Sequence, residues 1–399
     1  MPFQNHEAPP SKPALNQFLV MVMAVACAIT LANLYYIQPL LGEIAATFHV
    51  TQVSVGFVAM LTQIGYALGM LCILPLADIR EKRSLILIML LCAACSLMVM
   101  FLAPSVGWIS FAAFAIGFTS VVPQLLVPLA AQLAAPGERG KTIGTVMSGA
   151  LIGILLSRTF SGLVGEYWGW RNVYLIAAGF MVLLAIFLRR LLPLCPSFST
   201  LRYGELFRSM ATLVKTRPVL REASLNGAMV FGAFSAFWTT LVFLLGSSHY
   251  HLGADAAGLF GLVGVTGASA APIVGRIADR RSPKFTVGIS IMIIAAAYLC
   301  FLMFGFKLWG LIIGVILLDL GVQSCQVSNQ SRVYALDEAA RNRLNTVYMV
   351  SYFIGGALGS LLGSYNYAHF GWPGVCALGL LTQAIALIVH CRNRAAPVP

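Results

Sequence analysis

Charged residues are scarce in this sequence. Only 10% of its 399 residues are Asp, Glu, Lys or Arg, whereas 59% are hydrophobic. A water-soluble protein of this length needs many more charges to cover its surface. The composition therefore argues against an ordinary soluble enzyme or binding domain and predicts a protein embedded in a lipid bilayer.

Several functional signatures are also missing. Residues 1–15 are polar and rich in proline, and they lack the basic start and apolar stretch of a cleavable signal peptide, so we expect a disordered tail. The sequence contains no glycine–lysine phosphate loop, no metal-ligand set and no nucleophile placed beside a base. We expect neither enzymatic activity nor a cofactor, a bound metal or direct use of ATP.

Long apolar runs separated by short polar breaks dominate the rest of the chain. About 20 apolar residues form a helix long enough to cross the ~30 Å core of a bilayer. Lipid offers the backbone no hydrogen-bond partners, and the runs are too long for barrel strands, so an all-α membrane protein is expected. We place twelve spans at Asn16–Leu41, Val53–Ala77, Ser84–Ala103, Trp108–Leu133, Thr142–Gly165, Asn172–Leu192, Ala223–Leu245, Ala256–Ala278, Phe285–Phe306, Leu308–Ser331, Leu344–Tyr367 and Pro373–Cys391.

The distribution of positive charge predicts the orientation in the membrane. All but three of the 25 Lys and Arg residues fall in breaks on the side of the N-terminus; Arg171 and Lys307 lie opposite, and Arg158 lies inside a span. Such an excess marks the cytoplasmic side, so both termini are expected in the cytoplasm, with the protein in a bacterial inner membrane. The basic charge is thus explained by topology, and no nucleic-acid partner is expected.

Four histidines fall in the opposite, extracytoplasmic breaks. These are His49, His249, His251 and His369. A metal site or a pH sensor is conceivable there. Simple placement at the membrane interface is the favoured interpretation.

An internal repeat divides the chain into two halves. Three landmarks recur at nearly the same offset: Asp78 with Asp279, Arg139 with Arg341, and Trp170 with Trp372. Repeats of this kind are typical of transporters. We expect a cytoplasmic N-terminus (1–15), a six-helix bundle (16–192), a cytoplasmic linker with a short surface helix near 203–214 (193–222), a second six-helix bundle (223–391) and a cytoplasmic tail (392–399).

These features together resemble the major facilitator superfamily. The resemblance covers essentially the whole chain and rests on the six-plus-six arrangement, the long central loop and the paired Ala-Asp signatures after spans two and eight. It implies two pseudo-symmetric bundles that give alternating access to a small-molecule substrate. A monomer is expected.

The paired signatures define a candidate cytoplasmic gate. Its residues are Asp78, Lys82 and Arg83 in the first copy and Gly275, Asp279 and Arg280 in the second. An Asp beside basic residues, facing the N-terminal end of a helix, forms a polar latch, and the resemblance implies that Asp78 helps to hold the outward-facing state. A solvated turn whose charges only set topology is the alternative.

The fifth span carries glycines at the spacing of a motif found in proton-driven exporters. Gly144, Gly153 and Gly162 keep the intervals that let helices approach closely. Ser157, Arg158 and Ser161 replace a glycine, a proline and a glycine of that motif, and Ala113 stands where similar exporters have an arginine. The resemblance to drug or metabolite:proton antiporters is therefore one of spacing more than of identity.

Only Arg158 and Asp319 are expected as charges deep inside spans. Such charges are costly and usually mark a substrate pathway or a proton relay. We predict that Asp319 is the protonation site and that Arg158 is its partner or binds an anion. The alternative is a static ion pair, or an Asp that bonds to neighbouring backbone.

Spans one, four, seven and ten are expected to line a central cavity. Their candidate substrate contacts are Asn33, Tyr36, Gln38, Gln124, Trp238, Gln326 and Asn329. The repeat predicts that Gln124 and Gln326 face each other. Hydrogen bonding between helices is an equally good interpretation of each residue alone.

The sequence thus predicts a secondary active transporter that exports a small amphipathic organic compound in exchange for protons. Proton-coupled or facilitated uptake of a small organic solute is the first alternative. A polytopic membrane sensor or enzyme without transport is the second. The residues do not identify the substrate, because specificity depends on a few cavity side chains.

Overall fold

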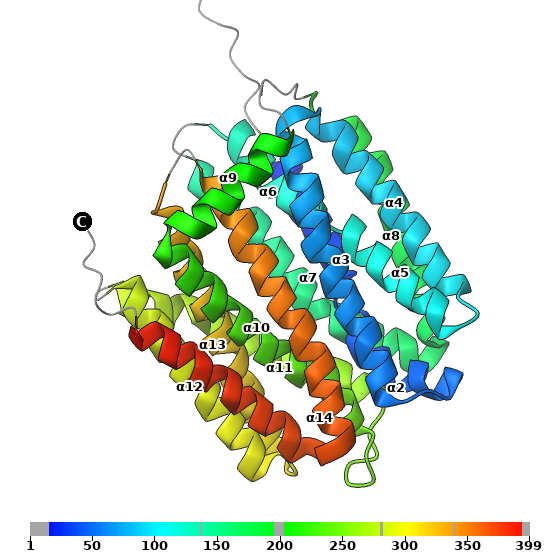
Figure 1. The fold of residues 1–399 in the computed structure, drawn as a ribbon. Coiled ribbons are helices and arrows are strands. Elements are labelled where there is room, and N and C mark those ends of the chain that lie inside the picture. The colour runs from blue at the N-terminus through cyan, green and yellow to red at the C-terminus, as the bar shows by residue number, and fades with distance from the viewer. Residues whose placement is uncertain (1–15, 136–137, 195–202, 280–281, 338–339, 393–399) are drawn as a thin grey trace, which may run out of the picture.

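Helices make up almost the entire described structure, which is a computed structural model and describes residues 16–135, 138–194, 203–279, 282–337 and 340–392 (Figure 1). They are α1 (Gln17–Ala32), α2 (Ile37–Phe48), α3 (Gln52–Ile79), α4 (Lys82–Leu102), α5 (Val106–Thr119), α6 (Val122–Leu133), α7 (Arg139–Trp168), α8 (Trp170–Leu191), α9 (Tyr203–Thr216), α10 (Pro218–Leu245), α11 (Ala254–Asp279), α12 (Pro283–Phe304), α13 (Leu308–Tyr334) and α14 (Arg341–Arg392). We call α1–α8 the N-terminal half and α10–α14 the C-terminal half.

The first and fourth spans are each broken into two helices. Pro39 offers no N–H to the carbonyl of Tyr35, and Pro123 offers none to that of Thr119, so the helical ladder is interrupted just before each proline. The two breaks meet, because Asn33 Nδ2 donates to Ser120 Oγ at 3.3 Å. Bent backbone is tolerated at this depth when protein, rather than lipid, surrounds it.

The repeat is visible in the backbone. Gly169 ends α7 with φ 86°, and Gly371, its equivalent, interrupts α14 with φ 63°. Positive φ suits glycine, which has no Cβ to clash. The tryptophans that follow, Trp170 and Trp372, are both buried and both donate through the indole N–H. The described helices form the twelve expected spans when some of them are grouped or divided. α1 and α2 make one span, α5 and α6 make another, and α14 makes two spans that meet at Gly371, while α9 belongs to the linker.

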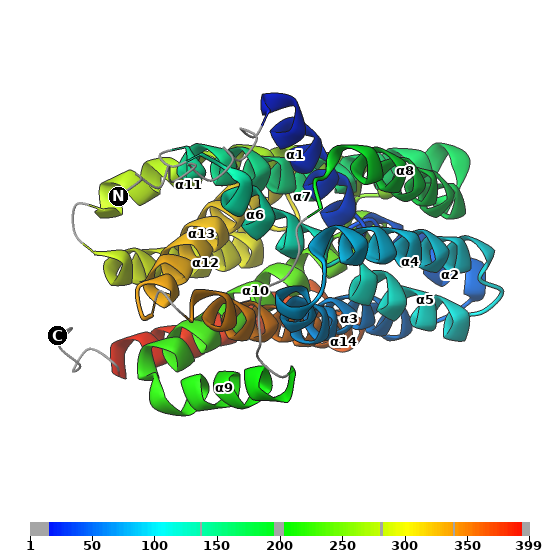
Figure 2. The ribbon, with the colours of Figure 1, turned by 90° about the horizontal axis from the view of Figure 1, so that it is seen from above.

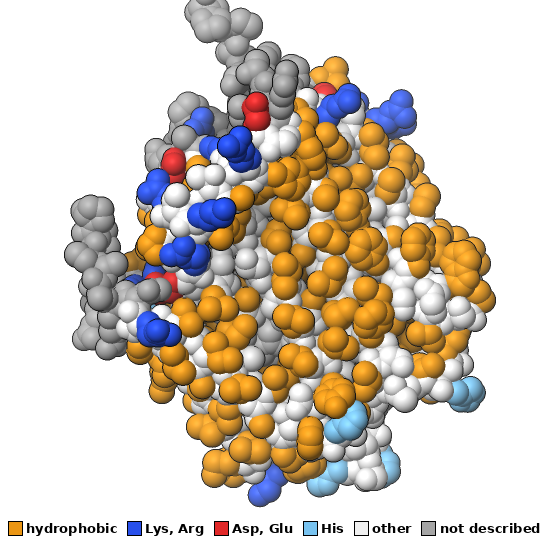
Figure 3. Space-filling model, viewed as in Figure 1, with side chains coloured by type: hydrophobic (Ala, Val, Ile, Leu, Met, Phe, Trp, Pro, Cys, Tyr) orange, Lys and Arg blue, Asp and Glu red, His pale blue; other side chains and the backbone are white. Residues whose placement is uncertain are grey.

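The surface supports a membrane setting. On the face shown in Figure 3, exposed hydrophobic side chains cover a broad area between two polar ends. We call the end with α9, Arg139 and Arg341 the basic end, and the opposite end, with His49 and His369, the histidine end. This division agrees with the predicted topology.

The halves meet along two pairs of helices. α3 packs beside α14 (Figures 1 and 2), and α7 packs against α11. The α7–α11 crossing is close: a Cβ on Gly162 would collide with the carbonyl oxygen of Ala254, and Thr159 Oγ1 donates to the carbonyl of Gly258 at 3.0 Å.

The linker contains the expected surface helix, α9, which lies across the basic end (Figure 1). Tyr203 on α9 donates to the carbonyl of Cys72 on α3 at 2.7 Å, and Arg343 on α14 donates to Ser209 on α9. The linker is shorter than predicted, because α10 begins at Pro218, a residue type that fits the first turn of a helix. The seventh span therefore starts before the predicted Ala223.

Candidate functional site

Arg158 is buried at the junction of the two halves. Its side chain is 0% exposed, and its Nε donates to Gln38 Oε1 of α2 at 2.8 Å. The guanidinium carbon lies 4.0 Å from the centre of the Trp238 ring and 5.3 Å from that of Phe234, both on α10, and 5.1 Å from the Tyr35 ring. Aromatic faces stabilise a cation in place of water. Neither Nη atom, however, has a hydrogen-bond partner among the residues that the structure describes.

Asp319 is equally buried, at 1% exposure, near the middle of α13. Neither carboxylate oxygen has a hydrogen-bond partner among the described residues, so Arg158 and Asp319 are not paired. α11 lies between them: a Cβ on Gly261 would be 3.1 Å from Cβ of Arg158, and one on Gly264 would be 3.2 Å from Oδ2 of Asp319. The two charges thus belong to different halves and pack against neighbouring glycines of one helix, and they interact electrostatically without forming a direct ion pair.

A narrow pocket adjoins Arg158, and in this conformation it is too small to hold a water molecule. Its lining comes from both halves and consists of Gln38, Pro39, Arg158, Trp238, Leu241, Val242 and Ala257. The predicted candidates Gln38, Arg158 and Trp238 therefore lie together. The side chain of Tyr36, also predicted, is buried against the Phe160 ring with centroids 5.7 Å apart.

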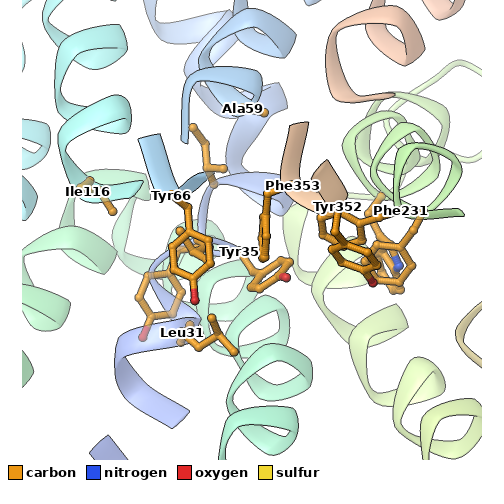
Figure 4. Packing of buried hydrophobic residues seen from close by; sticks show 14 of the residues in the cluster. Leu31, Tyr35, Ala59, Tyr66, Ile116, Phe231, Tyr352 and Phe353 are labelled. Atoms are coloured by element: carbon orange, nitrogen blue, oxygen red, sulfur yellow. The ribbon is translucent and has the colours of Figure 1, made fainter. Parts of the chain in front are cut away.

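The remaining predicted cavity residues are distributed more widely. Gln124 donates to the Tyr66 hydroxyl and Gln326 accepts from the Tyr352 hydroxyl, both at 3.3 Å, and no hydrogen bond joins the two amides. Aromatic rings lie between these regions: Tyr66 of α3 faces Phe353 of α14 with centroids 4.5 Å apart, next to Tyr35 (Figure 4).

The prediction missed a polar contact between the halves. Gln63 of α3 donates to Ser360 Oγ of α14 at 2.8 Å and accepts from Ser235 of α10 at 3.3 Å. Thr239 donates to the same Ser360 oxygen at 3.0 Å. A lone amide in the middle of the second apolar run was the available signal, and Ser360 is the repeat equivalent of Arg158.

A further buried charge cluster, which the sequence did not reveal, lies near the start of α10 and the ends of α13 and α14. Glu222 is 3% exposed, and its Oε2 lies 3.1 Å from Arg332 Nη2 of α13. His390 Nδ1 of α14 lies 3.5 Å from the other Glu222 oxygen. Asn329, predicted as a cavity residue, accepts from Arg332 at 3.3 Å and so belongs to this cluster. Glu222 was assigned to the linker because the start of α10 was placed too late.

The gate motif is described only in part. Lys82 donates to Gln132 at 2.8 Å, and Arg83 donates to the carbonyl of Arg189, both within the N-terminal half. Asp78 lies in the last turn of α3; Gly275 and Asp279 lie toward the end of α11, and Arg280 lies outside the described residues. The latch stays a prediction.

The three motif glycines of α7 behave differently. A Cβ on Gly153 would collide with backbone of Ala28 on α1, and Gly162 contacts α11 as described above. Gly144 has nothing within 4 Å of an added Cβ, so the close packing expected there is absent from the described structure. At the histidine end, Glu166 of α7 accepts from the backbone N–H of Ala254 at 3.1 Å.

Comparisons with known proteins agree with this architecture. A model of the Major Facilitator Superfamily matches residues 23–337. The chain is 39% identical over 389 residues to an uncharacterized transporter, YgaY, of Escherichia coli O157:H7, covering 98% of this chain and 97% of that protein. It is 26% identical over 351 residues to a probable sugar efflux transporter of Helicobacter pylori, covering 86% and 87%.

A solved structure shows the same fold. The crystal structure of a bacterial homolog of the human lysosomal transporter Spinster, in an inward-facing and occupied conformation, superposes with a TM-score of 0.74 at 15% identity and covers 98% of this chain and 100% of that one. The family match spans well over half of the chain, and the twelve-helix repeat is the one that this match implies. The chain therefore belongs to the Major Facilitator Superfamily and is a multi-pass membrane transporter, not an enzyme.

Proposed function

We propose that this transporter exports a small amphipathic organic compound in exchange for protons. It works by alternating access in a bacterial inner membrane, with both termini in the cytoplasm. The observation that carries the proposal is that Arg158 and Asp319, two buried charges in different halves, interact electrostatically but form no direct hydrogen bond or ion pair in the described part of the chain. A buried charge without a partner costs several kcal/mol, so a purely structural role would favour a direct ion pair.

The two halves supply the motion that this mechanism needs. Arg158 is held by α2 and α10, whereas Asp319 packs on α11, so rocking of one bundle against the other changes their separation. A carboxyl that faces a water-filled path on alternate sides of the membrane can carry a proton across. We assign proton binding to Asp319 and control of its charge to Arg158.

Several features support export and a structure closed toward the histidine end. The described bonds from α7 to α11, Thr159 to Gly258 and Glu166 to Ala254, lie in the half of the bundle nearest that end. The Helicobacter relative carries an efflux name, and the spacing of Gly144, Gly153 and Gly162 resembles that of exporters. Uptake of the same solute is the rival outcome.

The test begins with a growth screen. A deletion strain with and without the gene is grown on toxic compounds and metabolites, and the protective hits are taken into everted vesicles with a fluorescent reporter of the proton gradient. Export predicts that a hit accumulates in the vesicles and dissipates the gradient. Asp319→Asn should abolish both, whereas Glu138→Gln, an exposed acid at the start of α7 that caps nothing, should abolish neither. Wild-type exchange in Asp319→Asn would remove Asp319 from the mechanism.

A further inference from the structure

The pocket beside Arg158 contains more hydrogen-bond donors than acceptors. Nη1 and Nη2 of Arg158 and Nε1 of Trp238 are all buried, and within the described part of the chain none of them has an acceptor. Both residues line the same pocket. Gln38 already accepts from Nε of Arg158, so it satisfies only one of the guanidinium nitrogens.

Unsatisfied buried donors are unfavourable, and a buried cation without an anion is more so. An acceptor that carries negative charge would remove this deficit. The two Nη groups form a planar fork, and the planar fork of a guanidinium matches the two oxygens of a carboxylate. The indole N–H of Trp238 adds a donor on the ring that the guanidinium covers.

Asp319 interacts with the charge of Arg158 at longer range, but in the described structure it accepts no hydrogen bond from the guanidinium. Its carboxylate packs against Gly264, and its oxygens contact no donor. Apart from Gln38, the rest of the pocket lining is apolar or aromatic and includes Leu241, Val242 and Ala257. A single arginine among apolar side chains can neutralise one negative charge of a ligand. A second negative charge on the same ligand would stay buried without compensation.

We propose that this pocket binds the carboxylate of an organic monoanion whose body is aromatic or apolar. The carboxylate lies on the Nη fork of Arg158 and near Nε1 of Trp238, and the body extends along Leu241 and Val242. The proposal rests on the proposed function, since it names the substrate class of the exporter. The pocket is formed by α2, α7, α10 and α11, so rocking of the halves opens and closes it.

Equilibrium binding to the purified full-length protein tests this inference. The probes are radiolabelled benzoate, indole-3-acetate and decanoate, each with its neutral amide, and phenyl phosphate as a doubly charged analogue. Each acid should bind about tenfold or more tightly than its amide if it gains charge-assisted bonds to Arg158, and phenyl phosphate should bind weakly. Arg158→Gln should remove the preference for acids, and Trp238→Phe, which keeps a ring but removes the N–H, should reduce it.

Arg171→Gln is the matched control, because the Arg171 guanidinium also stacks on a tryptophan, Trp170 at 4.4 Å, but lies outside the pocket. Arg158→Lys keeps the charge without the fork, and it serves if Arg158→Gln does not fold. The inference is overturned if no acid binds more tightly than its amide, or if the preference survives at Arg158→Gln and Arg158→Lys. Binding needs no gradient, so this result is independent of proton-driven exchange: a transporter of neutral solutes would fail here and still pass the vesicle test.

Discussion

The guanidinium of Arg158 stacks on the ring of Trp238 at 4.0 Å, and this contact joins α7 of the N-terminal half to α10 of the C-terminal half. The contact lies beside the bend in the first span and lines the pocket described above. Arg158 is thus both a cation in the membrane and a structural link between the halves.

This link should be measurable as a coupling energy. The test is a double-mutant cycle that compares Arg158→Gln, Trp238→Leu and the double variant. Each single substitution already removes the desolvated cation–π contact, so the double variant should lose about 1–2 kcal/mol less free energy of unfolding than the sum of the two single losses. Reversible unfolding in SDS is the measurement. Strict additivity of the two single effects would contradict a stabilising contact.

Glu222 should be critical for stability. Its replacement by Ala leaves Arg332 and His390 buried without their acid, and we expect a loss of about 3–5 kcal/mol in the free energy of unfolding. Glu138→Ala is the comparison, since Glu138 is exposed and should change stability by less than about 0.5 kcal/mol. Equal effects of the two substitutions would show that the buried cluster contributes nothing.

The α7–α11 crossing should tolerate no side chain. Gly162→Val forces the two helices apart at the histidine end, so transport should fall by about tenfold or more while a cysteine placed at Ala254 reacts faster with an impermeant maleimide. Gly144→Val on the same helix meets open space and should leave both readings near the wild-type level. If Gly162→Val transports normally, the close crossing is not needed for the cycle.

Ser360 and Ser364 lie one turn apart on α14 and should respond differently to alanine. Ser360→Ala leaves Gln63 and Thr239 without their shared partner and should cost about 1–3 kcal/mol in the free energy of unfolding. Ser364 is buried with no partner for its hydroxyl, so Ser364→Ala should be neutral or stabilising. The reverse order would contradict the contact at Ser360.

The repeat and the twelve spans were predictable because they depend on local patterns. Hydropathy gives span length, and Trp170 with Trp372 marks equivalent corners, which the structure confirms through two glycines of positive φ. The end of the linker was placed too late because residues 193–222 form a long polar interval, whereas α10 already begins at Pro218. That error hid Glu222, whose partners come from helices distant in the sequence.

The candidate site was predictable only as a set of unusual residues. An isolated Arg and an isolated Asp within apolar runs stand out in the sequence, and both are indeed buried. Their separation was not predictable, because it depends on how the Gly261 and Gly264 face of α11 fits between α7 and α13. Gln63 was overlooked because the second span was not expected to face the cavity.

The linker helix α9 gives the chain a mechanical property that neither half has alone. It is bonded to α3 through Tyr203 and to α14 through Ser209. Any movement that spreads α3 from α14 at the basic end has to stretch or break one of these two bonds. If the halves rock as proposed, we expect α9 to resist their separation at the basic end, so that a segment outside both halves limits the amplitude of opening.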